Sequence, residues 1–414
     1  ELGRAFILLM QRHNEEKRAA YKLRKKQKRN GEPRSPTKLE MTSPITTLLN
    51  TRSCSPEPSL FPTNFCNAVR CYPPPSPPGL IKGLAKRKST GGKVKVLLRI
   101  SPSFPGETSS FLKVDQKKKQ VTLYDPTAIS HVSQKYRRMG VAAPKMFAFD
   151  SIFEPDSSQA EICSTSLTDV LQSVVNGSDG CVFAYGHSGL GKTFSMVGRD
   201  ESIHSLGIAP CSISWLFKLI DEKRERTGAR FSIRVSAVEV VGRSENLKDL
   251  LQEQSTADSS DATNGTKPSV YLYDDPVSGP QLLNHSELRA STAEKAAFYL
   301  DAALAARTQP YNDTDTEETL NSHMFFTIHV YQSRVDKIAG KMGVHGGRSR
   351  LHLIDLASCE RYNSTKKETS CCSMSLNGLG NVIIALINGA KHVPHKDSTL
   401  TRLLRESLGS TTCR

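Results

Sequence analysis

The chain has 414 residues, of which 37% are hydrophobic and 23% are charged, and its formal net charge is +15 at pH 7. This length allows two or three average domains, or one large α/β domain with an additional segment. No run approaches the length of a membrane-spanning helix, and the apolar residues 5–10 lead directly into charged residues, which is not typical of a signal peptide.

The positive charge is concentrated at the start of the chain. The first 95 residues contain 20 Lys and Arg against 6 Asp and Glu, so the remainder is nearly neutral. Residues 11–29 are rich in helix formers, and a basic helix over 5–29 is compatible with the pattern. Residues 33–89 are dominated by Pro, Ser and Thr, a composition that buries too little apolar surface to offset chain entropy. We therefore expect 1–92 to be a basic, Pro/Ser-rich and largely disordered region.

The ten cysteines show no repeated C-x-x-C spacing. Several lie within apolar strand or helix patterns, which favours reduced, buried thiols in a cytosolic protein over disulfides. Cys54, Cys66 and Cys71 have no histidine near them in the sequence, so a metal site there is not favoured.

From residue 93 onward, strand and helix patterns alternate. The predicted strands are 94–100, 120–124, 146–149, 181–185, 231–241, 324–331 and 350–356, and the predicted helices are 161–176, 208–226, 292–307, 375–388 and 398–408. Residues 254–267 are polar and predict a surface loop. This alternation predicts an α/β fold with a central mixed sheet flanked by helices on both faces.

Residues 186–193 read Gly-His-Ser-Gly-Leu-Gly-Lys-Thr and match the phosphate-loop pattern G-x-x-x-x-G-K-[ST]. They follow a predicted strand and precede a segment able to form a helix, which is the context that the pattern requires. Glycines let backbone N–H groups surround a pyrophosphate, Lys192 would reach the β- and γ-phosphates, and the Thr193 hydroxyl would hold Mg²⁺. A glycine-rich turn without a ligand is the plainer alternative. The predicted nucleotide-binding residues are Gly186, His187, Ser188, Gly189, Leu190, Gly191, Lys192 and Thr193.

Several further segments resemble the kinesin motor domain family. They are FDSIF at 149–153, FAYGHSGLGKTFSM at 183–196, LIDLASCE at 353–360, LGNVI at 379–383 and HVPHKDSTLTRLL at 392–404. The resemblance covers nearly all of 94–414 and identifies 93–414 as a kinesin-like motor domain, a P-loop NTPase, which we expect to be incomplete at its C-terminus. By its departures from the family pattern, the chain resembles the atypical kinesin-11 branch most. That resemblance implies microtubule binding with little or no motility.

The resemblance also implies ligands, partners and site residues. The cofactors would be ATP or ADP with Mg²⁺, the partner would be the microtubule in the cytoplasm and cytoskeleton, and any dimer would form through regions outside this chain. Asp355 would be the Walker-B-like carboxylate on the metal, and Glu360, which the second switch retains, would be the catalytic residue of a degenerate site. Lys396 and Arg402 would face the microtubule, although Thr399 stands where the family has lysine. The plain alternatives are a strand-end Asp that caps a turn and an ordinary solvated helix face.

The two switch segments depart from the family pattern. Residues 316–323 read TEETLNSH where the family has NxxSSRSH, so Leu320 replaces a serine that would meet metal and γ-phosphate, and Asn321 replaces an arginine. Ser358 replaces the glycine that senses the γ-phosphate, and its Cβ hinders a close backbone approach. Losing one oriented donor typically costs about 2.7–4 kcal/mol of transition-state stabilisation, so the sequence predicts little turnover.

The base pocket is altered as well. Residues 99–102 read Arg-Ile-Ser-Pro where the family has RxRP, so Ser101 replaces the arginine that would stack on adenine, while Pro102 is retained. Phe194 follows the phosphate loop, and the sequence leaves open whether it is an aromatic platform for the base or part of the core.

Two functions follow from this pattern. The first is a microtubule-binding tether or scaffold that binds nucleotide and has weak or absent ATPase. The alternative is an active ATP-driven microtubule motor, which is favoured by the intact phosphate loop and by the presence of Asp355 and Glu360. We expect no nucleic-acid partner, because the basic N-terminal region does not interleave aromatic with basic residues as stacking platforms require.

Overall fold

The computed structural model divides the chain into two compact units, 1–60 and 61–414. The structure describes residues 59–82, 94–102, 111–124, 144–187, 189–242, 244–257, 268–275, 279–308, 322–338, 341–359 and 372–409. The helix expected within 5–29 lies outside these residues. The second unit carries almost all of the described chain.

A mixed sheet forms the centre of the second unit. Its strand order is β11–β7–β12–β13–β6. The short strand β8 also pairs with β7, along residues 238–241. The strands are β6 (Gly180–Ala184), β7 (Arg230–Val241), β8 (Asn246–Asp249), β11 (Leu288–Arg289), β12 (His323–Ile338) and β13 (Lys341–Asp355). β13 and β6 run parallel, whereas β7, β12 and β13 are antiparallel neighbours. The predicted mixed sheet is therefore confirmed.

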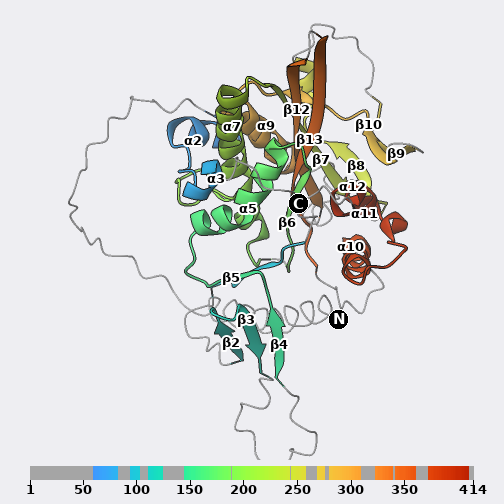
Figure 1. The fold of residues 1–414 in the computed structure, drawn as a ribbon. Coiled ribbons are helices and arrows are strands. Elements are labelled where there is room, and N and C mark those ends of the chain that lie inside the picture. Colours follow the sequence, from blue (N-terminus) through green and yellow to red (C-terminus); the bar gives the residue numbers. More distant parts are fainter. Residues whose placement is uncertain are drawn as a thin grey trace, which may run out of the picture. The chain divides into compact units, whose positions relative to one another are not determined.

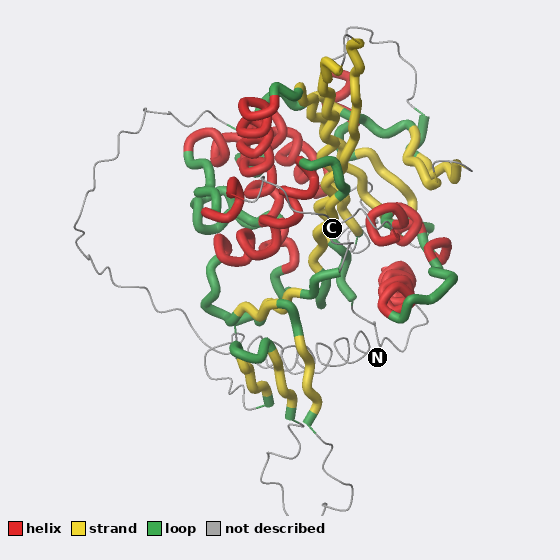
Figure 2. Tube along the Cα trace, in the orientation of Figure 1, coloured by secondary structure: helices red, strands yellow, loops and turns green. Residues whose placement is uncertain are grey.

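Helices cover both faces of this sheet (Figure 1). One face packs against α5 (Gln159–Val175), α7 (Ile208–Thr227) and α9 (Ala293–Thr308), and the other against α10 (Cys372–Ile387), α11 (Thr399–Leu403) and α12 (Arg405–Gly409). Figure 2 shows the central strands between these two groups of helices. Because successive strand residues point to opposite faces, Val235 and Ile328 enter the first core while Phe325 and Ile354 enter the second.

Smaller elements complete the described fold. β1 (Leu97–Arg99) pairs in parallel with β5 (Ser151–Phe153), while β2 (Leu112–Asp115), β3 (Gln120–Leu123) and β4 (Lys145–Ala148) form an antiparallel sheet. β9 (Tyr271–Asp275) and β10 (Gly279–Leu283) form a hairpin. The short helices are α6 (Lys192–Met196), α8 (Gln252–Ala257) and the 3₁₀ helix η3 (His395–Asp397). The predicted helix 398–408 is two short helices, since α11 ends before Leu404 and α12 follows it.

The expectation of a disordered linker over 33–89 is wrong for residues 59–82. This segment contains α2 (Phe65–Cys71) and α3 (Pro78–Lys82), and its side chains Phe65, Val69 and Leu80 are buried in the same core as α7 and α9. The carbonyl of Pro74, within the proline run, accepts a 3.1 Å hydrogen bond from Trp215 Nε1. Composition averaged over the Pro-rich stretch concealed the few apolar residues that fix it to the domain.

A buried carboxylate on α9 anchors the start of α2. Asp301, which is 1% exposed, accepts hydrogen bonds from Thr63 Oγ1 at 2.7 Å and from the backbone N–H groups of Phe65 and Cys66 at 2.9 Å each. These N–H groups belong to the first turn of α2, where no intrahelical acceptor exists. Asp301 therefore supplies the partners that the helix end needs and joins it to α9.

Two further expectations can be compared with the described residues. Six cysteines of this part of the chain are free thiols: Cys66, Cys71, Cys163, Cys181, Cys211 and Cys359. Within the same residues, no helix combines the length and the apolar character needed to cross a membrane.

We expect Asp301→Ala to destabilise the protein by about 2–4 kcal/mol, because it leaves two buried N–H groups and a hydroxyl without their acceptor. Urea unfolding measures the change. Asp221→Ala on α7 is a matched control, since its carboxylate is 59% exposed and pairs with the exposed Arg224 side chain one helical turn away. That control is expected to change stability by less than about 0.5 kcal/mol. Equal stability of Asp301→Ala and wild type would show that the 59–82 segment is not held in this way.

Candidate functional site

The glycine-rich loop connects β6 to α6. Gly189 and Gly191 adopt positive φ values of 75° and 82°, a region that side chains with a Cβ rarely enter, so these two glycines are what allow the loop to turn. Gly186 and His187 are buried, Leu190 is half-buried and Gly189 is exposed. The loop therefore has the strand–loop–helix context that its sequence predicts.

The lysine of the loop folds back over it. Lys192 Nζ donates a 2.9 Å hydrogen bond to the backbone oxygen of His187. This places a positive charge beside the backbone of the loop, within reach of an anion bound there. The arrangement is what phosphate binding by such a loop requires.

The hydroxyl of Thr193 and the carboxylate of Asp355 meet although they are far apart in sequence. Thr193 Oγ1 donates to Asp355 Oδ2 at 2.8 Å, which brings the start of α6 to the end of β13. Asp355 is 4% exposed, and its second oxygen, Oδ1, is buried with no hydrogen-bond partner among the described residues. A hydroxyl and a carboxylate oxygen are the hard oxygen ligands that Mg²⁺ prefers, so these two residues fit that ion.

Arg307 lies at the end of α9 and is a member of the site that no sequence motif marks. Its Nη1 donates to Asp355 Oδ2 at 2.8 Å, its Nη2 donates to the backbone oxygen of Ser322 at 2.9 Å, and its Nε lies 3.6 Å from Glu239 Oε1. The guanidinium thus joins two buried carboxylates. The available signal was a single cation ending an Ala-rich helix immediately before the segment predicted as the first switch.

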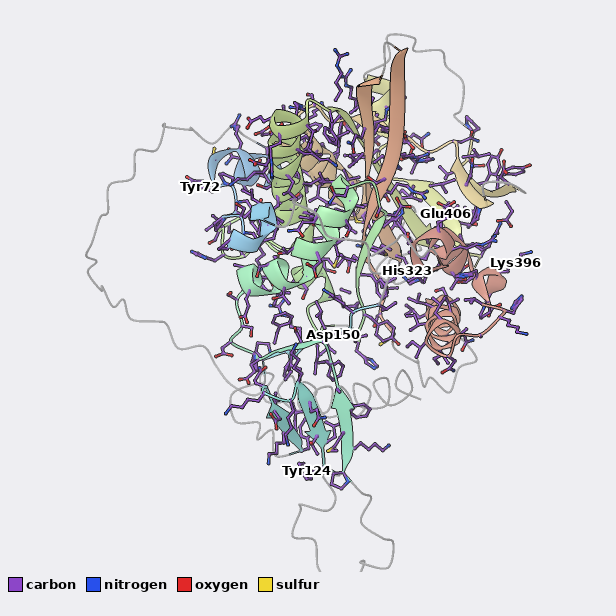
Figure 3. The ribbon with its side chains drawn as sticks, viewed as in Figure 1. Tyr72, Tyr124, Asp150, His323, Lys396 and Glu406 are labelled. Atoms are coloured by element: carbon purple, nitrogen blue, oxygen red, sulfur yellow. The ribbon has the colours of Figure 1, made fainter. Side chains whose placement is uncertain are left out.

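The last two residues of the 316–323 stretch are held by the sheet. The Ser322 hydroxyl donates to Glu239, and His323 Nδ1 accepts a 3.0 Å hydrogen bond from the N–H of Ala357. His323 Nε2 lies 2.9 Å from Ser375 Oγ on α10 and must carry the ring proton, since Nδ1 is an acceptor. Burial first, and the charge of Arg307 second, lower the pKa of His323 to about 3, so the ring is neutral at pH 7. Figure 3 labels His323 on the α10 side of the sheet.

The segment after β13 contacts the loop through its backbone. The N–H of Cys359 donates a 3.3 Å hydrogen bond to the carbonyl of Gly186. Ser358 precedes it and is half-buried. The predicted second switch therefore begins directly beside the phosphate loop.

Arg99 and Phe194 meet near the predicted base pocket. Arg99 Nη1 donates to Gln159 Oε1 and Ser195 Oγ, both at 2.7 Å, and its Cζ lies 5.3 Å from the centroid of the Phe194 ring. Arg199 Cζ lies 5.9 Å from the same ring. Phe194 is only half-buried and lies near two guanidinium groups, which differs from a pure core position. Pro102 is exposed.

The two cations predicted to face the microtubule have different surroundings. Lys396 lies in η3 and is exposed, as Figure 3 shows. Arg402 Nη2 donates to Asp274 Oδ2 on β9 at 2.8 Å. The charge of Arg402 is therefore paired within the chain, whereas the charge of Lys396 projects from the surface.

Several predicted site residues lie outside the described part of the chain, and their roles stay predictions. These are Ser188, Leu320, Asn321 and Glu360.

The sheet, the flanking helices and the glycine-rich loop before α6 define an α/β protein of the P-loop class. The family model of the kinesin motor domain matches residues 106–413. This chain therefore belongs to the kinesin family, as its motifs indicated.

Known relatives and a solved structure agree with this assignment. The chain is 55% identical over 364 residues to human kinesin-like protein KIF26B, covering 86% of this chain and 17% of that protein. It is also 55% identical over 367 residues to mouse kinesin-like protein KIF26A, covering 86% of this chain and 19% of the relative. The chain thus spans less than a fifth of these relatives. These atypical kinesins agree with the branch that the sequence resembles.

A more distant relative and a solved structure extend the comparison. The chain is 40% identical over 381 residues to kinesin-like protein GA13060 of Drosophila pseudoobscura pseudoobscura, covering 84% of this chain and 31% of the relative. The structure titled "Structure of a fast kinesin: Implications for ATPase mechanism and interactions with microtubules" superposes with a TM-score of 0.59 at 25% identity. It covers 76% of this chain and 81% of its own chain.

We expect stability to fall as the pH decreases below about 6.5, because buried His323 and His352 have their pKa lowered to about 3 and about 4 by burial. The unfolded chain takes up protons at these groups near pH 6.5, whereas the folded chain does so only near pH 3–4. Each depressed histidine therefore stabilises the protein above pH 6.5, and this contribution is lost at up to about 1.4 kcal/mol per pH unit as the pH falls.

Urea unfolding between about pH 7 and pH 5 measures this effect. His323→Gln retains an amide that can donate and accept hydrogen bonds but removes the titrating ring. The slope of the unfolding free energy against pH should therefore be smaller in the variant than in wild type, by up to about 1.4 kcal/mol per pH unit. A slope equal to that of wild type would show that His323 is not held neutral by the fold.

Proposed function

We propose that this chain is a microtubule-binding kinesin-like protein that holds ATP or ADP with Mg²⁺ at residues 186–193 and has weak or absent ATPase, serving as a tether or scaffold in the cytoplasm and cytoskeleton. One contrast carries the proposal. Thr193 and Asp355 are hydrogen-bonded to each other where Mg²⁺ would bind, whereas the hydroxyl of Ser322, in the first-switch stretch, donates to Glu239.

Nucleotide binding is supported by four groups that converge on one end of the sheet. The loop backbone and Lys192 would hold the phosphates, while Thr193 and Asp355 would hold Mg²⁺. When bound, the ion would neutralise phosphate charge. Asp355 Oδ1, which lacks a hydrogen-bond partner among the described residues, is the oxygen best placed to accept it.

Weak hydrolysis is supported by the groups that should close over the γ-phosphate. Ser322 is fully buried, its hydroxyl donates to Glu239 and its carbonyl accepts from Arg307, so the hydroxyl and the carbonyl are both used within the protein. Leu320 has no oxygen to offer and Asn321 has no guanidinium. Phosphoryl transfer depends on positioning and electrostatic stabilisation, so losing several such groups removes most of the catalytic contribution of the protein.

Microtubule binding is supported by family membership and by surface charge. Lys396 is exposed, and the basic first 95 residues would add long-range, salt-sensitive attraction to the acidic tubulin surface. Dimerisation, if it occurs in the whole protein, would use segments outside this chain. Nothing in the described site favours a nucleic-acid partner.

An active motor is the second candidate, favoured by the intact Thr193–Asp355 pair and by the presence of Glu360 in the sequence. The two candidates differ in what repair of the first switch should do. A motor that already turns over gains little from it, whereas a tether with a defective switch gains activity.

We expect steady-state ATP hydrolysis at saturating microtubule concentration to be at least about 10²-fold slower than the 1–10³ s⁻¹ typical of enzymes, because several donors to the γ-phosphate are lost. The double variant Leu320→Ser with Asn321→Arg should raise the rate.

Lys192→Ala is the control for that measurement, since it removes the phosphate-binding ammonium and should abolish any turnover that belongs to this site. Hydrolysis by wild type at ordinary motor rates, unchanged by the double variant, would favour the motor.

We expect Lys396→Ala to weaken microtubule co-pelleting several-fold, and more so at low salt, because its charge is exposed. The double variant Arg402→Ala with Asp274→Ala keeps the net charge and should bind almost as wild type does, since it removes an already paired cation. The single variant Asp274→Ala frees Arg402 and should strengthen binding. A loss in the neutral double variant as large as that in Lys396→Ala would show that Arg402 contacts the microtubule despite its ion pair.

A further inference from the structure

One face of the central sheet changes character along its strands. Near the candidate nucleotide site this face is apolar, with Val240, Phe325 and Ile354 packed under α10 and α11. Farther along the same strands, the register places only polar and aromatic residues on this face: Ser232, Arg234 and Ser236 of β7, Thr327, His329 and Tyr331 of β12, and Arg348, Arg350 and His352 of β13. Core packing does not explain why this part of the sheet face is polar.

The short segment between β10 and β11 brings two more polar side chains to this face. His285 Nε2 lies 3.6 Å from Glu287 Oε1, and His329 Nδ1 lies 3.8 Å from the same oxygen. The three potential ligand atoms all lie within 4.8 Å of one another. Two imidazoles and a carboxylate converge on one point over this face of the sheet.

We propose that His285, Glu287 and His329 form a binding site for a divalent transition-metal ion of the Zn²⁺ class. Two imidazole nitrogens and one carboxylate oxygen are a ligand set that such ions favour, with a fourth position for water. The spacing between the ligand atoms needs only small side-chain rotations to reach metal–ligand distances of about 2.0–2.2 Å.

The hydrogen bonds around the cluster already orient the ligand atoms. His329 Nε2 lies 2.9 Å from Ser236 Oγ, while His329 Nδ1 accepts from Arg348 Nη2 at 3.2 Å, so the lone pair is on the nitrogen that faces Glu287. Tyr331 donates its hydroxyl proton to Glu287 Oε2 at 3.1 Å, which leaves Oε1 directed to the two histidines. Partners of this kind, which fix the tautomer of a histidine and the orientation of a carboxylate, accompany metal ligands in proteins.

A cation already occupies the centre of the cluster. The Nη2 atom of Arg348 contacts both His329 Nδ1, at 3.2 Å, and Glu287 Oε1, at 3.4 Å. The Arg348 side chain is 48% exposed and that of Arg234, 4.0 Å from Glu287, is 50% exposed. Both can therefore extend into solvent when a metal ion replaces the guanidinium. Competition with Arg348 lowers the metal affinity, and it also shows that the site favours positive charge.

The site is separate from the phosphate loop. His329 pairs with Arg350, five residues along β13 from Asp355, which corresponds to about 17 Å at the usual strand rise. A metal ion there would join the segment before β11 to the central strand β12. Its role would be to fix that edge of the sheet, independent of nucleotide.

Cobalt(II) and zinc(II) titrations of the whole chain test the proposal, in the absence of nucleotide and Mg²⁺. We expect one equivalent to bind, with a visible Co²⁺ spectrum of nitrogen and oxygen ligands. Glu287→Gln, His285→Gln and His329→Gln should each weaken binding at least about tenfold, because each removes one of three protein ligands. Arg348→Gln should strengthen it by removing the competing guanidinium. His204→Gln, at an exposed histidine elsewhere, is the matched control and should bind as wild type does.

Three results would overturn the proposal. These are the absence of a stoichiometric equivalent, binding that survives the three ligand variants, and a thiolate-to-cobalt charge-transfer band, which would assign the ion to cysteines. Because His329 is buried and its variant can fail to fold, His285→Gln, at a position before the strand, decides the matter if its urea unfolding matches wild type. Unchanged binding by that folded variant would exclude the site.

Discussion

The Asp355 carboxylate is the group through which the candidate nucleotide site is assembled. It ends β13 and is bound by the Thr193 hydroxyl of α6 and by the Arg307 guanidinium of α9, each at 2.8 Å. Asp355 and Arg307 have side chains that are 5% and 17% exposed, and removing one partner of such a buried pair typically costs about 3–5 kcal/mol. One side chain thus links the phosphate loop, the central sheet and the helix that leads to the first switch.

The same linkage extends to the first-switch stretch. Arg307 also donates a hydrogen bond to the carbonyl of Ser322 and lies beside Glu239. Glu239 in turn accepts a hydrogen bond from the Ser322 hydroxyl. The end of the first-switch stretch is therefore fixed to the sheet by groups that face inward. The phosphate loop is held by its own glycines and Lys192, by the hydrogen bond from Thr193 to Asp355 and by the hydrogen bond from the Cys359 N–H to the Gly186 carbonyl. The residues of the phosphate loop keep the family pattern, whereas Leu320, Asn321 and Ser358 of the switch segments and Ser101 of the base pocket depart from it.

The parts of this account that were predictable from sequence are those in which neighbouring residues carry the signal. The phosphate loop, the strand end at Asp355 and the alternation of helices with strands are local patterns. The fold of residues 59–82 was not predictable because its anchors, Asp301 and Trp215, lie more than a hundred residues away. Arg307 and the Arg402–Asp274 pair were missed for the same reason, since only the tertiary fold determines which carboxylate each arginine meets.

Equilibrium titration with a non-hydrolysable ATP analogue and with ADP, each with and without Mg²⁺, tests the central claim most directly. The account predicts that Mg²⁺ strengthens both ligands through Thr193 and Asp355, and that their affinities differ by less than about tenfold, or 1.4 kcal/mol, because no switch closes on the γ-phosphate. Much tighter binding of the analogue than of ADP would contradict the account, since it would require working donors to the γ-phosphate from 316–323 or from the segment after β13.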